Sequence, residues 1–328
     1  MKFGPRPLST AKGCILAHSV ALPERRLRKG TALEETHIAQ LAEAGLQQVT
    51  VAALDPDDVE ENAAAQQLGE ALIAGTTGIG LSKAATGRVN LMARGAGVAM
   101  LDVNKLTALN EVNPMISLAT VPPFHQMHEN AMLGTVKIIA YGVPMGDLHA
   151  ACAHARGALD LAQPLRLPAS LIITQIKEGA DESKAIAATK ARLAALGSAL
   201  IETMICGHDT ASIAATISRA KGDIILILTG SATSDPADVA PSALIQAGGR
   251  LERFGMPVDP GNLLFLGTLG DKPVIGLPGC ARSPALNGAD KVLSRVLCGV
   301  AITSADIAAM GVGGLLKEIP TRPRPREA

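Results

Sequence analysis

The sequence predicts an α/β protein, with a doubly wound, mostly parallel sheet in its C-terminal part and α+β modules before it. In residues 168–320, short apolar runs alternate with stretches of helical periodicity, the order expected when helices connect parallel strands. The run at 224–228 is apolar throughout instead of alternating with polar residues, which is typical of a strand covered on both faces. A chain of 328 residues, 48% of them apolar, can form two or three domains.

The C-terminal domain is expected at residues 168–320, after a proline-containing linker at 163–168. Gly197 and Gly248-Gly249 are expected to end helices. In chain order we predict a strand at 169–174, a helix at 181–196, a strand at 199–205, a helix at 210–220, a strand at 224–228 and a strand at 272–277. The tail at 321–328, with its repeated Arg-Pro, is predicted to be disordered.

The first 165 residues are predicted to form two smaller modules. Residues 1–60 form a small α/β unit and residues 61–165 an α+β module. The elements of the first are a strand at 11–20, a helix at 31–44 before Gly45, and a strand at 48–52. Those expected next are a helix beginning at 58, strands at 87–92, 97–101, 116–121 and 136–141, and helices at 103–112 and 145–161.

The composition excludes several functional classes. Lys plus Arg and Asp plus Glu are balanced at 30 each, and only 2% of residues are aromatic. Nucleic-acid-binding proteins more often have a basic excess and aromatic side chains for base stacking, so no nucleic-acid partner is expected. A small anionic ligand needs only local positive potential, which loop amides and helix ends supply.

The cysteines and the hydropathy indicate the compartment. There are five cysteines, an odd number, and no Cys-x-x-Cys. We therefore expect a reduced, cytoplasmic protein. Because no apolar run is long enough for a signal peptide or a membrane span, we expect neither secretion nor a membrane contact.

The stretch after the strand at 224–228 predicts an oxyanion-binding loop. No bulky side chain occurs in this loop, and small residues let an anion approach the backbone N–H groups, which can form a concave nest. Ligands of such sheets bind beyond the carboxyl ends of the strands. The alternative is a simple strand-to-helix turn. The predicted contacts are Thr229, Gly230, Ser231, Ala232, Thr233 and Ser234.

A second loop, after the strand at 272–277, predicts the other wall of the site. It contains Pro278, Gly279, Arg282 and Ser283. The guanidinium of Arg282 can bind a phosphate through two parallel hydrogen bonds. The alternative is that Arg282 is an ordinary surface arginine.

The order of these motifs resembles the molybdopterin-binding domain of molybdopterin adenylyltransferases, molybdenumtransferases and competence-damage proteins. The matching residues are Thr229-Gly230, Asp238-Val239-Ala240-Pro241 and Leu277-Pro278-Gly279, and the resemblance covers roughly residues 168–309. Ser231 and Thr233 replace two glycines of the usual pattern, and Cys280-Ala281 replaces Asn-Pro. We therefore expect ligand binding to be retained more readily than catalysis.

The resemblance implies a role in molybdenum cofactor biosynthesis. The chain would bind molybdopterin or its nucleotide derivative, and would insert molybdate, transfer a nucleotidyl group as a transferase, or hold the cofactor. It also implies that Asp238 and Asp209 are catalytic residues that hold Mg²⁺ beside a phosphate. The alternative for both is helix capping, with Asp235 as N-cap, Pro236 first and Asp238 third in one helix, and Asp209 or Thr210 as N-cap of another.

Other functions and partners remain open at this point. The same fold serves nucleotide pyrophosphatases or deamidases of the competence-damage type, and a non-catalytic carrier or scaffold is a further alternative. The resemblance implies a homo-oligomer, and a molybdoenzyme or a nucleotidyltransferase as protein partner.

Overall fold

The computed structural model describes residues 1–316 and separates into two compact units. The first unit comprises residues 1–95, 99–123 and 129–161. The second comprises residues 96–98, 124–128 and the chain from 162 onward. The predicted tail at 321–328 lies outside the described residues. The predicted division of the first 165 residues into two modules stays a prediction.

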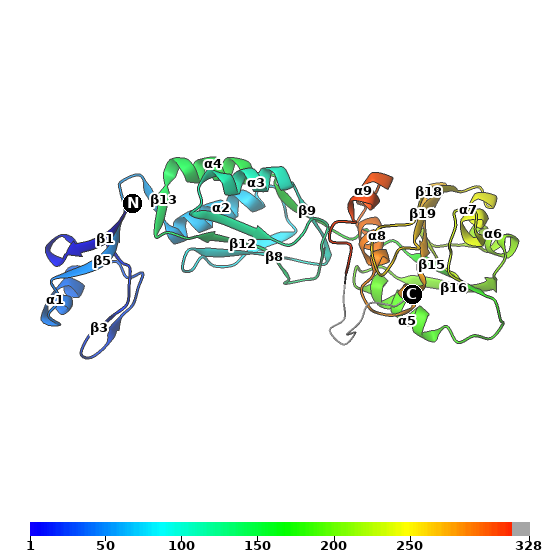
Figure 1. Ribbon diagram of the computed structural model, residues 1–328, viewed down its shortest axis with the longest axis horizontal. Helices are drawn as coiled ribbons and strands as arrows, with labels where there is room; N and C mark the ends of the chain where they lie inside the picture. The colour runs from blue at the N-terminus through cyan, green and yellow to red at the C-terminus, as the bar shows by residue number, and fades with distance from the viewer. Residues whose placement is uncertain (317–328) are drawn as a thin grey trace. The chain divides into compact units, whose positions relative to one another are not determined.

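The second unit contains a six-stranded sheet of order β16-β15-β17-β20-β19-β18 (Figure 1). The strands β15, β16, β17 and β20 are parallel to one another, whereas β18 and β19 pair antiparallel. The predicted α/β fold class is therefore confirmed. The strand bounds are β15 Ala169–Gln175, β16 Leu200–Gly207, β17 Ile224–Leu228, β18 Arg250–Phe254, β19 Phe265–Leu269 and β20 Lys272–Leu277.

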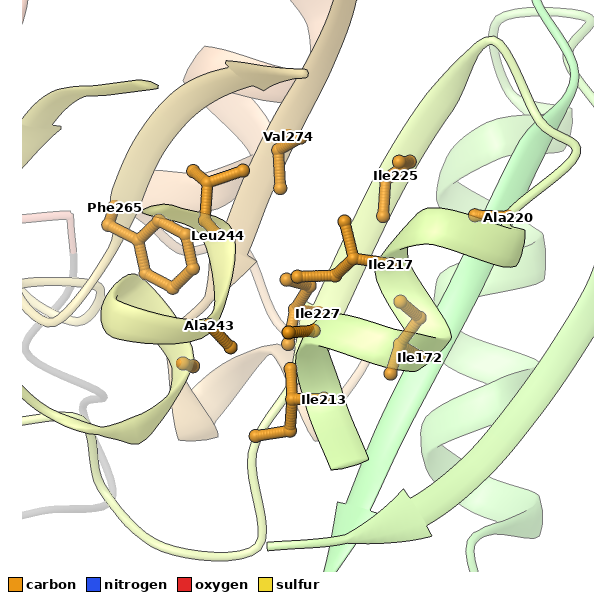
Figure 2. Close-up of a cluster of buried hydrophobic side chains, with 12 residues drawn as sticks. Ile172, Ile213, Ile217, Ala220, Ile225, Ile227, Ala243, Leu244, Phe265 and Val274 are labelled. Atoms are coloured by element: carbon orange, nitrogen blue, oxygen red, sulfur yellow. The ribbon is translucent and has the colours of Figure 1, made fainter. Parts of the chain in front are cut away.

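Helices cover both faces of this sheet, α6 and α7 on one and α5 and α8 on the other (Figure 1). Figure 2 shows the core on the α6 and α7 side, where Ile213 and Ile217 face Ile172 and Ile227 of the central strands. Every residue of β17 is buried, as a strand between two helical layers requires. The helices are α5 Ser183–Ala194, α6 Thr210–Arg219, α7 Val239–Gln246, the short 3₁₀ helix η2 Gly279–Arg282, α8 Gly288–Leu297 and α9 Ser304–Ala309.

The N-terminal residues form a small sheet of order β1-β5-β2 with a separate β3-β4 ribbon. Leu16, Leu41 and Val51 contribute to its core. The predicted strand at 11–20 is wrong, because Gly13 turns the chain at φ +80° and only two short strands form there. The bounds are β1 Lys2–Pro7, η1 Leu8–Thr10, β2 Ile15–Leu16, β3 Val20–Ala21, β4 Arg26–Leu27, α1 Glu35–Glu43 and β5 Gln48–Ala53.

The remaining part of the first unit has a four-stranded sheet of order β10-β12-β8-β7 and a β13-β6 ribbon. The helix predicted at 103–112 is confirmed as α3. The bounds are β6 Asp58–Glu60, α2 Glu61–Ile73, β7 Ile79–Leu81, β8 Arg88–Ala93, β9 Gly97–Leu101, α3 Val103–Val112, β10 Ile116–Thr120, β12 Met132–Ile138, β13 Gly142–Pro144, α4 Met145–Ala155 and β14 Leu159–Ala162. The strand β11 Gln126–Met127, which pairs with the start of β9, belongs to the second unit.

Two predictions for this region are wrong. The helix predicted to start at residue 58 starts at Glu61, because Glu60 caps it with its side chain and the three residues of β6 pair with β13. The helix predicted at 145–161 ends at Ala155, because Gly157 adopts φ +63°. The apolar residues after it belong to β14, in which Leu159 and Leu161 are buried and Asp160 is exposed.

All five cysteines, which lie within the described residues, are free thiols. Burial raises the pKa of the Cys298 thiol to about 11. Within residues 1–316, no helix combines the length and the apolar character that crossing a membrane demands.

Candidate functional site

The candidate site lies at the carboxyl edge of the parallel strands of the second unit. Since β15, β16, β17 and β20 are parallel, the segments that follow them emerge at this one edge. Arg282 Nη2, after β20, donates a hydrogen bond of 3.1 Å to the carbonyl oxygen of Thr229, after β17. The fold thus brings the two loops predicted from the sequence together.

Gly230 fixes the β17 loop against the neighbouring strand. Its N–H donates a 2.9 Å hydrogen bond to Oγ1 of Thr174, near the end of β15. A Cβ atom at Gly230 would lie 2.7 Å from the carbonyl oxygen of Thr174 and 3.4 Å from the amide nitrogen of Ile176. The position therefore requires glycine because of close backbone approach.

The rest of this loop contains backbone donors without a partner among residues 1–316. Thr229 Oγ1 donates to the carbonyl oxygen of Ser231 at 2.6 Å and lies 3.2 Å from Oγ1 of the buried Thr233. The N–H of Ser234 is bonded to Asp238. Within residues 1–316, the amides of Ser231, Ala232 and Thr233 donate to no protein acceptor. Three consecutive free N–H groups can bind an oxyanion.

Asp238 is the N-cap of α7. Its Oδ1 accepts from Val239 N at 2.7 Å and its Oδ2 from Ser234 N at 3.0 Å. The predicted capping pattern, with Asp235 as N-cap and Pro236 first, is wrong because α7 starts at Val239. Pro241 explains the later start: it has no N–H to donate and fits only in the first turn of a helix. The metal-binding and catalytic role of Asp238 stays a prediction.

Asp209 caps α6, accepting from the N–H of Ser212 at 2.9 Å. This hydrogen bond lowers the pKa of the Asp209 carboxyl below its ordinary value. The capping alternative is confirmed for Asp209, and its catalytic and metal-binding role stays a prediction. The residue before it, His208, has Nδ1 2.7 Å from Thr174 Oγ1.

Thr174 connects two loops of the site and was not predicted from the sequence. It is fully buried and contacts both Gly230 and His208. Its hydroxyl oxygen accepts from Gly230, so its single hydrogen is free to donate to Nδ1 of a neutral imidazole. The sequence signal was a hydroxyl residue directly after the apolar run Leu171–Ile173.

Arg282 is already paired within the protein. Its Nη1 forms an ion pair with Oε2 of Glu182, whose side chain is 8% exposed. With its bond to Thr229, the guanidinium links three segments of the site. Its predicted phosphate contact stays a prediction, and Glu182 was not found from the sequence.

Arg192 of α5 holds the second loop in place. Its Nε donates to Asp290 Oδ1 at 2.7 Å, and its terminal nitrogens donate to the carbonyl oxygens of Ala281, Ser283 and Ala285 at 2.7–3.1 Å. The planar fork of arginine suits such multiple acceptors. The wall predicted from Pro278, Gly279 and Ser283 is therefore ordered by a helix about 90 residues earlier in the sequence.

A cavity of about 680 Å³ adjoins this wall, a volume within the range of small-molecule sites. It lies between α5 and the segment after η2. Arg282 and Ser283 belong both to the predicted site and to this cavity, whereas residues 229–234 do not line it. Its lining is completed by Asp181, Glu182, Lys184, Ala185, Ala187, Ala188, Ala191 and Pro284.

No group of three or more His, Cys, Asp or Glu side chains in residues 1–316 is placed to hold a metal ion. Both carboxylate oxygens of Asp238 accept backbone N–H groups. A bound Mg²⁺ would therefore need oxygens from a phosphate ligand in addition to one protein carboxylate.

Comparison with protein families decides the class of this domain. Residues 172–297 match a family described as "Probable molybdopterin binding domain". This part of the chain is similar to molybdopterin-binding domains. The predicted resemblance is thus confirmed. Residues 5–53 match a domain of unknown function (DUF8806). Among curated protein sequences, none matches the chain.

Solved structures similar to this chain include three proteins of molybdopterin or molybdenum cofactor biosynthesis. A molybdopterin biosynthesis MoeA protein from Pyrococcus horikosii is 15% identical, with 90% of this chain and 75% of that chain covered and a TM-score of 0.33. A molybdopterin biosynthesis protein from Mycobacterium abscessus is 14% identical (40% and 92% covered, TM-score 0.28). A molybdenum cofactor biosynthesis protein from Pyrococcus furiosus is 13% identical (92% and 66% covered, TM-score 0.24).

Proposed function

We propose that the second unit binds molybdopterin or its nucleotide derivative and that the protein acts in molybdenum cofactor biosynthesis. The free amides of Ser231, Ala232 and Thr233 carry this proposal. They lie at the strand end where this sheet architecture binds ligands, in a domain of the matching family. The phosphate of the ligand accepts hydrogen bonds from these amides.

The organic part of the ligand occupies the cavity beside η2. Alanine side chains of α5 supply its apolar surface, and Lys184 and Arg282 supply cationic groups for polar ring substituents. The pair between Arg282 and Glu182 fixes the guanidinium before the ligand arrives, which reduces the ordering cost of binding.

Binding is the primary activity under this proposal. The amides of residues 231–233 stabilise negative charge on the phosphate, and Thr174 fixes the orientation of the loop and of His208. Mg²⁺, held by Asp238 or Asp209 together with ligand oxygens, would supply charge neutralisation for molybdate insertion or nucleotidyl transfer. A molybdoenzyme or a nucleotidyltransferase then receives or delivers the cofactor.

Calorimetric titration with molybdopterin tests the proposal. Ala232→Pro removes one of the three N–H groups, whereas the control Ala232→Gly keeps it. A hydrogen bond to a charged group contributes about 1.5–3 kcal/mol, so the proline variant should bind roughly ten- to hundredfold more weakly. The glycine variant should bind like the unsubstituted protein.

Two outcomes would contradict the proposal. In the first, molybdopterin at saturating concentration produces no heat of binding and does not protect the protein from proteolysis. This outcome would support a scaffold that binds no ligand. Metal-dependent cleavage of small nucleotides in the same preparation would instead support the competence-damage type of enzyme.

A further inference from the structure

The side chain of His208, the residue directly after β16, lies beside the loop that follows β17. In the sheet, β15 lies between β16 and β17, and Thr174 near its carboxyl end contacts the segments after both neighbours. Thr174 Oγ1 lies 2.7 Å from Nδ1 of His208 and accepts the N–H of Gly230 at 2.9 Å. The imidazole and the residue that precedes the free amides are therefore both within hydrogen-bond distance of one oxygen atom.

The contacts of Thr174 determine which nitrogen of His208 carries the hydrogen. Thr174 is fully buried, so a hydroxyl hydrogen without an acceptor would be costly. Its oxygen already accepts from Gly230, and within residues 1–316 Nδ1 of His208 is the one acceptor that the hydroxyl contacts. A neutral imidazole accepts through Nδ1 only when its hydrogen is on Nε2. The hydrogen-bond network therefore assigns the Nε2–H tautomer to His208.

The Nε2–H group of His208 is a free donor in contact with solvent. No atom of residues 1–316 accepts a hydrogen bond from it. In the same residues, the buried side-chain atoms without a hydrogen-bond partner are Ser198 Oγ and Arg295 Nε. Nε2 of the half-buried His208 is not one of them, so this nitrogen is accessible to a ligand.

The candidate site therefore contains a side-chain donor as well as backbone donors. The three free amides belong to Ser231, Ala232 and Thr233, the residues directly after Gly230. Because Nδ1 of His208 is occupied by Thr174, the imidazole offers a ligand its donor and no acceptor. An ionised phosphate has several oxygens that only accept hydrogen bonds. The amides and the imidazole can thus bind different oxygens of one phosphate.

We propose that His208 binds the ligand by donating its Nε2–H to an oxygen of the phosphate that the loop after β17 holds. This inference rests on the proposed function and adds one side-chain donor to the three backbone donors. Thr174 is the positioning residue of both, since its hydroxyl holds the loop through Gly230 and holds His208 in the donating tautomer.

Nitrogen-15 NMR of the full chain with labelled histidine tests the tautomer. At about pH 8, where an ordinary histidine is neutral, the His208 signals should show a hydrogen on Nε2 and none on Nδ1. Loss of these signals in His208→Asn or His208→Gln assigns them. His149, exposed on α4, is the control and should show the average of two tautomers. A hydrogen on Nδ1 of His208 would overturn the proposal.

The same NMR sample tests the contact with the ligand. Saturating molybdopterin should shift the Nε2 signal of His208, because its hydrogen gains an acceptor, and should leave the signals of His149 in place. An Nε2 signal that does not move at saturation would exclude the contact. This measurement uses the unsubstituted protein and is independent of the stability of any variant.

Calorimetric titration with molybdopterin separates ligand binding by His208 from a purely structural role. His208→Asn keeps an oxygen that can accept from Thr174 but has no donor at the position of Nε2, so it should bind roughly tenfold more weakly. His208→Gln places an amide N–H near that position and should bind more tightly than His208→Asn. A purely structural role predicts the reverse order, because glutamine loses the link to Thr174. The control His149→Asn should bind like the unsubstituted protein.

The titrations also distinguish failure of this inference from failure of the proposed function. If the unsubstituted protein binds molybdopterin and Ala232→Pro weakens binding, an unchanged affinity of His208→Asn overturns the histidine contact alone. If the unsubstituted protein gives no heat of binding with molybdopterin, the proposed function and this inference both fail.

Discussion

At the scale of single residues, the candidate site depends on contacts that only a few side chains can make. Gly230 is the clearest case, because the backbone of β15 leaves no room for a Cβ atom. Thr174 adds the polar link from this glycine to His208. A fully buried hydroxyl would be costly without such partners. Both residues fix the loop that carries the free amides.

Gly230→Ala should destabilise the second unit by about 1–3 kcal/mol, because its Cβ would lie 2.7 Å from the carbonyl oxygen of Thr174. Urea denaturation followed by circular dichroism measures this. The control for stability is Gly279→Ala, since a Cβ atom there has no neighbour within 4 Å, and its effect should stay within about 0.5 kcal/mol. Equal stability of the two variants would show that the loop moves away from β15 at no cost.

At the scale of elements, the N-cap residue of α7 has a structural role and a predicted chemical role. The carboxylate of Asp238 caps α7 and bonds the N–H of Ser234 in the loop. The same group is the predicted Mg²⁺ ligand. These roles make different demands, because capping needs an oxygen acceptor whereas metal binding benefits from the negative charge.

Asp238→Asn and Asp238→Ala separate the two roles. Asparagine keeps one of the two acceptors and should cost less stability than alanine, which should cost at least about 1 kcal/mol. If Asp238 holds Mg²⁺, both variants should lose any Mg²⁺-dependent increase in molybdopterin affinity, measured by calorimetry with and without the metal. An asparagine variant with the full Mg²⁺ effect would leave Asp238 with capping alone.

Sequence reasoning succeeded where a local pattern determines the element. The apolar run of β17 and the helix α3 follow from composition over a few residues. It failed where one backbone angle decides, as at Gly157, which ends α4 although apolar residues continue. The candidate site was predicted from its loops. The ion pair of Arg282 with Glu182 joins residues 100 positions apart. Their proximity depends on the order of the strands in the sheet, which a local sequence pattern does not predict.

At the scale of the whole molecule, the second unit includes a segment that the sequence assigns to the middle module. Residues 124–128 belong to the second unit. Phe124 has a backbone φ of +60°. The centroid of its ring lies 3.6 Å from the guanidinium carbon of Arg295 on α8. Arg295 is 7% exposed, and its Nε has no hydrogen-bond partner among the described residues. Burial lowers the pKa of this guanidinium, so the aromatic face compensates part of the desolvation.

A double-mutant cycle with Phe124→Leu and Arg295→Met should therefore give a coupling of about 1 kcal/mol in the full chain, measured by urea denaturation. A fragment of residues 162–328 lacks Phe124. In that fragment Arg295→Met should cost less stability than in the full chain, by about the same coupling energy. An equal cost of Arg295→Met in both would mean that Phe124 contributes no cation–π energy.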